Sequence, residues 1–357
     1  MKKLSTLLAI IICLVACKKE VITNIPDDEG VNVVYAAGSV IDVTGMSKAC
    51  YWKNGNLVLL PMPETAFGST STIIQKDKDI YVCGSYNSNG TFIGCVWKNS
   101  TKQDLQMITG FPRVSPQKMF IVGNDVYVSG SVDNGFSAKI CYWKNGVPTV
   151  ITDVHDNSAI NNANAIYVSG NDIYITGQST KYPGIEVASY WKNGTRSDLT
   201  FTHTTQWSMG KDIKFVNNTL YAGGYAYDAA NLVSQAMIWK NGMGQSLPTI
   251  GDASVEDLAI IENDVYASGW FKRNRGAIKE ACYWKNNAIN ILQTPEGSES
   301  ETSSIALNNA EIFIGGTIRN LETGKSSAVY WKNGTKVNLA NGSQNDARVA
   351  DIFIGKE

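Results

Sequence analysis

One short motif, Trp-Lys-Asn, dominates the chain and occurs seven times along its 357 residues. Successive copies lie 45 to 48 residues apart, a spacing too regular to arise by chance. Repeats of about this length are supersecondary units that bury their apolar surface against neighbouring copies. The chain is therefore expected to be an array of seven similar units. The motif tryptophans are Trp52, Trp97, Trp143, Trp191, Trp239, Trp284 and Trp331.

Each repeat is expected to form four short strands. In the sixth copy these are predicted at 257–261, 265–269, 281–285 and 288–292. In most copies a glycine follows the motif, and Asn-Gly favours a type I′ hairpin turn because both turn residues need a positive φ. Four-stranded units at this period are typical of β-propeller blades. The sequence thus predicts an all-β, seven-bladed β-propeller over residues 31–357.

The two ends of the array predict how the ring closes. The first copy has no first strand, because Val31 leads directly into its second strand. The last copy is followed by a lone strand, 351–354, which aligns with the first strand of the other copies. We expect this C-terminal strand to pair with the three N-terminal strands. Such closure removes the exposed sheet edges of an open array.

Two resemblances agree with this prediction. The second-strand ending Ile80 to Gly84 is similar to Kelch repeats, although Tyr and Trp are adjacent here and most copies lack the glycine pair. Residues 31–357 more closely resemble bacterial propeller lipoproteins with Tyr-Trp-Lys-Asn-Gly repeats. The resemblance implies a fold and a compartment but no activity, since a fold alone does not supply a function.

The N-terminus has the pattern of a lipoprotein signal peptide. Lys2 and Lys3 precede an apolar stretch, 7–15, that is too short to span a membrane. Leu14-Val15-Ala16-Cys17 resembles the lipobox of bacterial lipoproteins. We therefore expect residues 1–16 to be removed, a diacylglyceryl group on Cys17, and a polar tether over 17–30. Because Lys18 replaces the aspartate typical of inner-membrane retention, outer-membrane anchoring is expected, facing the periplasm or the cell surface.

Charge and motif content exclude several function classes. The net charge is −1, and loss of Lys2 and Lys3 makes it about −3, so no basic surface for nucleic acid is expected. His155 and His203 are the only histidines. We find no nucleotide-binding or hydrolase motif and no metal-ligand spacing, and predict no catalytic residue, cofactor or metal. A closed ring needs no partner copy, so a monomer is expected.

The cysteines of the mature chain allow two interpretations. Cys50, Cys95, Cys141 and Cys282 each lie two residues before a motif tryptophan, which predicts a small buried side chain. Cys83 stands outside this pattern, on the strand before Cys95. An oxidising compartment permits a Cys83–Cys95 disulfide, and both a disulfide and free thiols remain open.

Ligand-binding residues are sought on the face that carries the variable connections. Connections between the second and third strands, and from one repeat to the next, differ among copies, and binding residues usually lie on such loops. Trp270 stands where other copies have Ser, Gln or Gly, so the repeat does not require it. Aromatic side chains of this kind stack on sugars or anchor proteins, although local loop packing is the alternative. The candidate ligand-binding residues are Trp207, Trp270, Phe271, Tyr182, Tyr227, Arg273 and Arg275.

A second candidate is a ring of residues near the start of the first strand of each copy. If these positions line the mouth of the central channel, Asp212, Asp257 and Asp351 come together and could hold a cation. Ordinary strand-end polarity is the alternative. The ring consists of Thr72, Lys118, Ala165, Asp212, Asp257, Ser304 and Asp351.

Three functions are compatible with these features. We favour a non-catalytic binding module of the cell envelope that recognises a glycan or a protein through the variable face. A polysaccharide-acting enzyme with carboxylates at the channel mouth is the second, and an envelope assembly scaffold is the third.

Overall fold

A computed structural model describes residues 30–151, 162–182, 185–201, 207–249, 251–340 and 346–357. Residues 32–357 form one compact unit. The predicted signal peptide, Cys17 and nearly all of the predicted tether lie outside the described residues, as do His155 and His203. Within the described part of the chain, no helix has the length and apolar character needed to cross a bilayer.

The described residues form 28 strands in six sheets, five of four strands and one of eight. The eight-stranded sheet contains two antiparallel sets of four, β4–β7 and β8–β11, joined by a single parallel pair between Phe92 and Arg113. The strands are β1 (Asn32–Ile41), β2 (Ser47–Lys53), β3 (Asn56–Leu59), β4 (Phe67–Lys76), β5 (Asp79–Ser88), β6 (Thr91–Lys98), β7 (Thr101–Asp104), β8 (Arg113–Val122), β9 (Asp125–Asp133), β10 (Ala138–Lys144), β11 (Val147–Ile151), β12 (Asn162–Ser169), β13 (Asp172–Tyr182), β14 (Ile185–Lys192), β15 (Thr195–Asp198), β16 (Ser208–Val216), β17 (Thr219–Asp228), β18 (Val233–Lys240), β19 (Met243–Ser246), β20 (Ala253–Ile261), β21 (Asp264–Phe271), β22 (Glu280–Lys285), β23 (Ala288–Ile291), β24 (Ser298–Asn308), β25 (Glu311–Asn320), β26 (Ser326–Lys332), β27 (Thr335–Asn338) and β28 (Asp346–Lys356).

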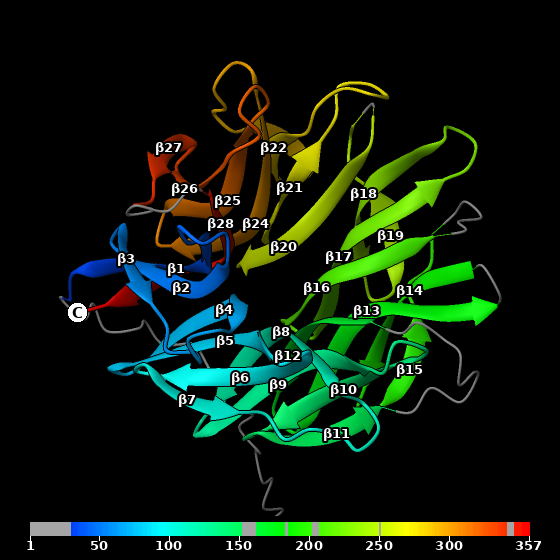
Figure 1. Cartoon of the computed structure of the whole chain (residues 1–357). Helices are drawn as coiled ribbons and strands as arrows, with labels where there is room; N and C mark the ends of the chain where they lie inside the picture. Colours follow the sequence, from blue (N-terminus) through cyan, green and yellow to red (C-terminus); the bar gives the residue numbers. More distant parts are fainter. Residues whose placement is uncertain (1–29, 152–161, 183–184, 202–206, 250, 341–345) are drawn as a thin grey trace, which may run out of the picture. The chain divides into compact units, whose positions relative to one another are not determined.

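The four-stranded sets are arranged around a common centre (Figure 1). The first strand of each set contacts the first strand of the next, in the order β28, β4, β8, β12, β16, β20, β24 and again β28. The predicted all-β, propeller-like architecture is therefore confirmed. In the sixth repeat the predicted strands agree with β21, β22 and β23 to within two residues at each end, and β20 begins four residues earlier than predicted.

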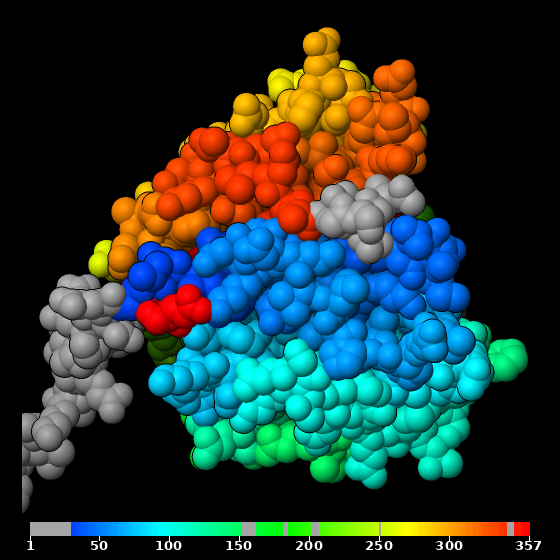
Figure 2. Space-filling view, turned by 60° about the vertical axis from the view of Figure 1, so that its left-hand side comes forward, coloured from blue at the N-terminus to red at the C-terminus, as the bar shows by residue number. Residues whose placement is uncertain are grey.

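The predicted closure by the C-terminal strand is also confirmed. β28 pairs antiparallel with β1 from Asn32–Lys356 to Ile41–Asp346, and the sheet order is β28-β1-β2-β3. The closing strand, Asp346–Lys356, is longer than the predicted 351–354. Figure 2 shows the C-terminal residues, in red, against the N-terminal strands, in blue. Because β28 pairs with β1, the inner edge of the first N-terminal strand is covered by the C-terminal strand.

The Asn-Gly turns have the predicted backbone conformation. Asn145 and Gly146 have φ values of +51° and +83°, both in the left-handed region that a type I′ turn requires. The Asn145 side chain also accepts a hydrogen bond of 2.9 Å from the Val126 amide of the neighbouring strand. The other copies repeat this bond, with donors Val34, Ile80, Ile173, Leu220, Val265 and Ile312. Asparagine therefore both forms the turn and ties it to the sheet.

The motif lysines lie at the same end of the sheets as the Asn-Gly turns. Lys144 pairs with Asp125 at 2.8 Å, and its ammonium lies 5.3 Å from the centre of the Tyr127 ring. Exposed pairs of this kind add little stability, so their recurrence marks a repeated scaffold surface and not a site. Equivalent pairs are Lys98–Asp79, Lys192–Asp172, Lys285–Asp264 and Lys332–Glu311.

The motif tryptophans are buried between neighbouring sheets. All seven are at most 1% exposed. Trp97 of β6 packs with Val33 and Leu60 of the preceding repeat, and its indole N–H donates to the Pro61 carbonyl at 2.9 Å. Each sheet is thus fastened to its neighbour by the largest side chain in the core.

Replacing a motif tryptophan is expected to loosen one junction of the ring. Trp97→Ala should lower the free energy of unfolding by about 3–5 kcal/mol, because it leaves a cavity and an unpaired carbonyl. Urea unfolding followed by circular dichroism measures the loss. Trp207, which is 46% exposed, provides the matched control, and Trp207→Ala should change stability by less than about 1 kcal/mol. Equal effects of the two substitutions would contradict the junction role.

Candidate functional site

The inner strands carry a bulge at one recurring place. In β20, for example, the pairing with β21 shifts between Val255 and Asp257, so that Glu256 is the extra residue. A bulge bends the strand and re-aims its side chains. The residue after the bulge is the ring position recognised in the sequence: Thr72, Lys118, Ala165, Asp212, Asp257, Ser304 and, on β28, Asp351.

The three ring aspartates link neighbouring sheets. Asp212 accepts a hydrogen bond from the Leu258 amide of the next sheet at 3.1 Å. Asp257 accepts one from Ile305 at 2.9 Å, and Asp351 one from Ile73 at 3.0 Å. A carboxylate at this position therefore satisfies a buried backbone donor on the inner strand of the next sheet.

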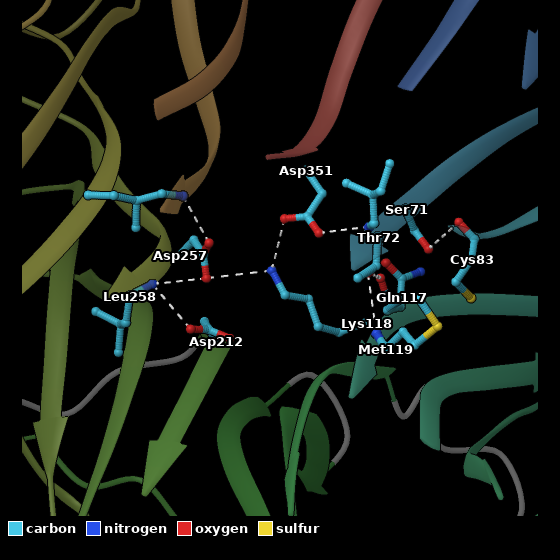
Figure 3. A network of polar contacts seen from close by, with 12 residues as sticks. Ser71, Thr72, Cys83, Gln117, Lys118, Met119, Asp212, Asp257, Leu258 and Asp351 are labelled. Carbon is cyan, nitrogen blue, oxygen red and sulfur yellow. Dashed lines mark hydrogen bonds and ion pairs between the residues drawn. The ribbon is translucent and has the colours of Figure 1, made fainter. Parts of the chain in front are cut away.

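The same aspartates surround two lysines of the chain, and Figure 3 shows them with the first, Lys118. The Lys118 ammonium lies 3.4 Å from Asp351 and 3.6 Å from Asp257. Lys214, which Figure 3 does not draw, lies 2.6 Å from Asp212 and 3.6 Å from Asp257. We call these five residues the central charge cluster.

The predicted meeting of Asp212, Asp257 and Asp351 is thus found, but their use as a cation site needs correction. The charges that face them are lysine ammonium groups, and a compact salt-bridged network forms where a bound cation was one of the two alternatives. Among the described residues, no group of three or more His, Cys, Asp or Glu is arranged to hold a metal ion.

The cluster has three acids and two bases, and its pKa shifts reflect this imbalance. Burial raises the pKa of Asp212 to about 6, with Lys214 opposing and Asp257 adding to the rise. Burial would also raise the pKa of Asp257, but Lys118 and Lys214 outweigh it and lower the value. Burial raises the pKa of Asp351. Burial alone would lower the pKa of Lys118, yet the surrounding carboxylates hold it above its usual range.

Next to the cluster lies a pocket of about 580 Å³, which we call the inner-strand pocket. Four bulge residues from consecutive sheets, Lys211, Glu256, Ser303 and Ala350, line it. The bulge thus directs one residue to the pocket, while the following residue occupies the ring position. The other lining residues are Tyr225, Ser234, Ala253, Ser254, Trp270, Lys279, Glu301 and Thr302.

One wall of the pocket is a continuous chain of polar contacts across three sheets. Lys211 pairs with Glu256 at 3.5 Å, and the Trp270 indole N–H donates to Glu256 at 3.1 Å. The Lys279 ammonium lies 4.5 Å from the centre of the Trp270 ring and pairs with Glu301 at 2.8 Å. Trp270, predicted from its departure from the repeat, therefore lies at the middle of this wall.

The other predicted ligand-binding residues are dispersed. Trp207 and Tyr227 pack together on a neighbouring sheet, with ring centres 5.6 Å apart. Phe271 is only 7% exposed and belongs to the hydrophobic core, so its prediction as a ligand contact is wrong. Strand alternation explains this result, because Phe271 follows Trp270 and must face the other side of the sheet.

The two candidate arginines lie outside the inner-strand pocket. Arg273 is held by Glu280 in a bidentate pair of 2.6 and 2.7 Å. Arg275 is exposed on the connection between β21 and β22. The side chain of Tyr182 is outside the described residues.

The candidate disulfide is not formed, because Cys83 and Cys95 are both free and buried. Cys83 pairs across the sheet with Val96, whereas Cys95 pairs with Gly84. This offset of one residue turns the two side chains to opposite faces of the sheet. Cys50, Cys141 and Cys282 are buried free thiols as well.

Sequence reasoning missed several residues that build the site. Lys211 and Glu256 immediately precede two ring positions, so counting one residue back in each copy would have found them. Lys214 follows Asp212 by two residues and therefore shares its face of the strand. Tyr225 gave no signal, because half-buried tyrosines are common on these strands.

No protein-family model matches the chain, and no curated protein matches it in sequence. Among solved structures, Trypanosoma rangeli sialidase in complex with sialic acid is 9% identical with a TM-score of 0.47, over 83% of this chain and 56% of that chain. The structure of YjhT is 10% identical with a TM-score of 0.37, over 90% and 97% of the two chains. GH43 endo-arabinanase from Bacillus licheniformis is 10% identical with a TM-score of 0.33, over 65% and 99%. The chain thus spans little more than half the length of the sialidase, and the propeller-like fold rests on its own sheet order.

Within the central charge cluster, replacing Asp212 and replacing Asp257 by asparagine should change the stability of the folded protein in opposite directions. The raised pKa of Asp212 means that its ionisation disfavours the folded state above about pH 6. Asp212→Asn, which keeps a carbonyl oxygen to accept from the Leu258 amide, should therefore stabilise the protein at pH 8, and the gain should shrink as pH falls through 6 towards 4. The pKa of Asp257 is lowered, so Asp257→Asn should be destabilising at pH 8. Thermal melting of both variants from pH 4 to 8 measures these effects, and shifts of the same sign would refute the assignment.

Proposed function

We propose that the chain is a non-catalytic binding module of the cell envelope that recognises a glycan in the inner-strand pocket. One observation carries the proposal: this pocket lies beside the variable connections and is walled by Trp270 and Tyr225 together with hydroxyl and charged side chains. Pockets that combine an aromatic surface with a few polar groups are typical of small-ligand and sugar sites. A protein ligand is the alternative, and a folded domain would need a broader contact than this pocket provides.

Binding is favoured over catalysis by the state of the carboxylates. Glycoside hydrolysis uses two carboxyl groups, one as an acid and one as a base or nucleophile. In the pocket, Glu256 and Glu301 are each paired with a lysine. The ring aspartates are bonded to backbone amides and lysines, so they are committed to holding the sheets together. Analysis of products after incubation with a bound polysaccharide tests the enzymatic alternative, and bond cleavage would decide for it.

We further propose that the ring has seven blades of four strands. The order in which seven first strands contact one another supports this count. The single Phe92–Arg113 pair that joins β4–β7 to β8–β11 is consistent with a contact between two blades, since blades are held by full antiparallel ladders.

A lipid anchor on Cys17 and an outer-membrane location complete the proposal, and they rest on the sequence pattern alone. Anchoring would keep the binding face close to the cell surface or within the periplasm. Protease treatment of intact cells separates a surface receptor, which would be released, from a periplasmic scaffold, which would be protected.

The proposed pocket can be tested with one aromatic substitution. After a glycan array has identified a ligand, Trp270→Ala should weaken its binding at least about tenfold, a loss of about 1.4 kcal/mol, in isothermal titration calorimetry. Phe136, which is 92% exposed in the connection between β9 and β10, gives the matched control, and Phe136→Ala should bind normally. Unchanged binding by Trp270→Ala would move the site elsewhere.

Removing the predicted acyl acceptor tests the anchor. Cys17→Ala should abolish labelling by an alkyne fatty acid and shift the protein from the membrane to the soluble fraction of the envelope, because the buried acyl chains provide the binding energy. Lys18→Ala keeps the cysteine and should remain labelled in the membrane fraction. A labelled, membrane-bound Cys17→Ala protein would contradict the prediction.

A further inference from the structure

The charged residues of the inner-strand pocket balance one another. Its lining includes two lysines and two glutamates, joined as Lys211–Glu256 and Lys279–Glu301. An anionic ligand would have to displace a glutamate from its lysine. A cationic ligand would have to displace a lysine from its glutamate. A hydroxyl group can donate to a paired carboxylate and accept from a paired ammonium, since both retain unused hydrogen-bonding capacity. The wall therefore suits an uncharged, hydroxyl-rich ligand.

An aromatic surface continues from the pocket along one strand. Tyr225 lines the pocket, and Tyr227 lies two residues further along β17. Side chains two residues apart share a face of a strand and stand about 7 Å apart along it. The burial pattern agrees, because Tyr225 and Tyr227 are half-buried and Ala226 between them is fully buried.

Trp207 widens this surface beyond the pocket. It pairs across the sheet with Tyr227, whose amide donates to the Trp207 carbonyl at 2.8 Å, and their rings lie 5.6 Å apart. Trp207 remains 46% exposed although it is a large aromatic residue. Neither Trp207 nor Tyr227 lines the pocket, so a ligand confined to the pocket would leave this aromatic pair unused.

Resting on the proposed function, we infer that the ligand is an uncharged oligosaccharide. One end occupies the inner-strand pocket against Trp270, and a following sugar unit stacks on the Trp207–Tyr227 pair. Stacking on an aromatic ring needs no charge and uses the apolar face of a sugar. The pocket thus selects a neutral sugar, and the aromatic pair selects a chain longer than one unit.

Calorimetry with a defined panel tests both parts. The panel contains cello-, manno- and xylo-oligosaccharides of one to six units, and galacturonic acid oligomers as acidic probes. We expect a neutral oligosaccharide to bind at least tenfold more tightly than its monosaccharide and than the acidic oligomers. Trp207→Ala should reduce the affinity for the oligosaccharide to that for the monosaccharide, and leave the monosaccharide unaffected. Equal affinities for short and long sugars would overturn the extended site.

A charge variant tests the neutral preference. Glu301→Gln leaves Lys279 without its carboxylate, so the affinity for galacturonic acid oligomers should rise about tenfold. Glu322 is exposed in the connection between β25 and β26 and gives the control. Glu322→Gln should leave this affinity unchanged. Preference of the unaltered protein for the acidic oligomers would overturn the inference and leave glycan recognition intact. Failure of every sugar in the panel and of a wider glycan array to bind would instead overturn the proposed function.

Discussion

The structure depends on the burial of one tryptophan at each junction between neighbouring sheets. A four-stranded sheet of this size cannot bury its apolar faces alone, and the indole ring fills the space between one sheet and the next. Because every junction uses the same residue, the sheets are held at similar spacing and the array can return to its beginning. β28 then completes the first sheet, so the ring is closed by ordinary backbone hydrogen bonds.

This repetition divides the molecule into a scaffold and a variable part. At one end of the sheets, the motif lysine and asparagine make the same contacts in copy after copy, which leaves that end with little to distinguish one blade-like unit from another. At the inner strands, the bulge presents a different residue in each copy. Lys211, Glu256, Ser303 and Ala350 occupy equivalent places and yet give the pocket an asymmetric wall. Pattern-breaking residues therefore gather at the inner-strand bulges, where the backbone repeats and the side chain does not.

Much of the fold was predictable from the sequence because the pattern of each strand occurs in several copies of the repeat. Asn-Gly turns, strand alternation and the unmatched C-terminal strand each have local causes, and the structure agrees with them. The site was predictable only in part. Trp270 and the ring aspartates lie at the candidate site, whereas Phe271, which was named as a ligand contact, belongs to the hydrophobic core. Lys118 and Lys214 lie where the aspartates were thought able to hold a cation.

The sequence by itself determined the repeating unit, its four strands, its turns and the manner of closure, since these follow from periodicity and backbone preference. Only the tertiary structure decided which side chains meet. Lys118 and Asp351 are 233 residues apart and still share an ion pair, because closure of the ring brings all inner strands to one centre. Two examples depend on a shift of a single residue in strand pairing. One is the offset that separates Cys83 from Cys95, and the other is the bulge that turns Glu256 towards Trp270. Such shifts reverse the direction of a side chain without altering the strand pattern from which a sequence is interpreted.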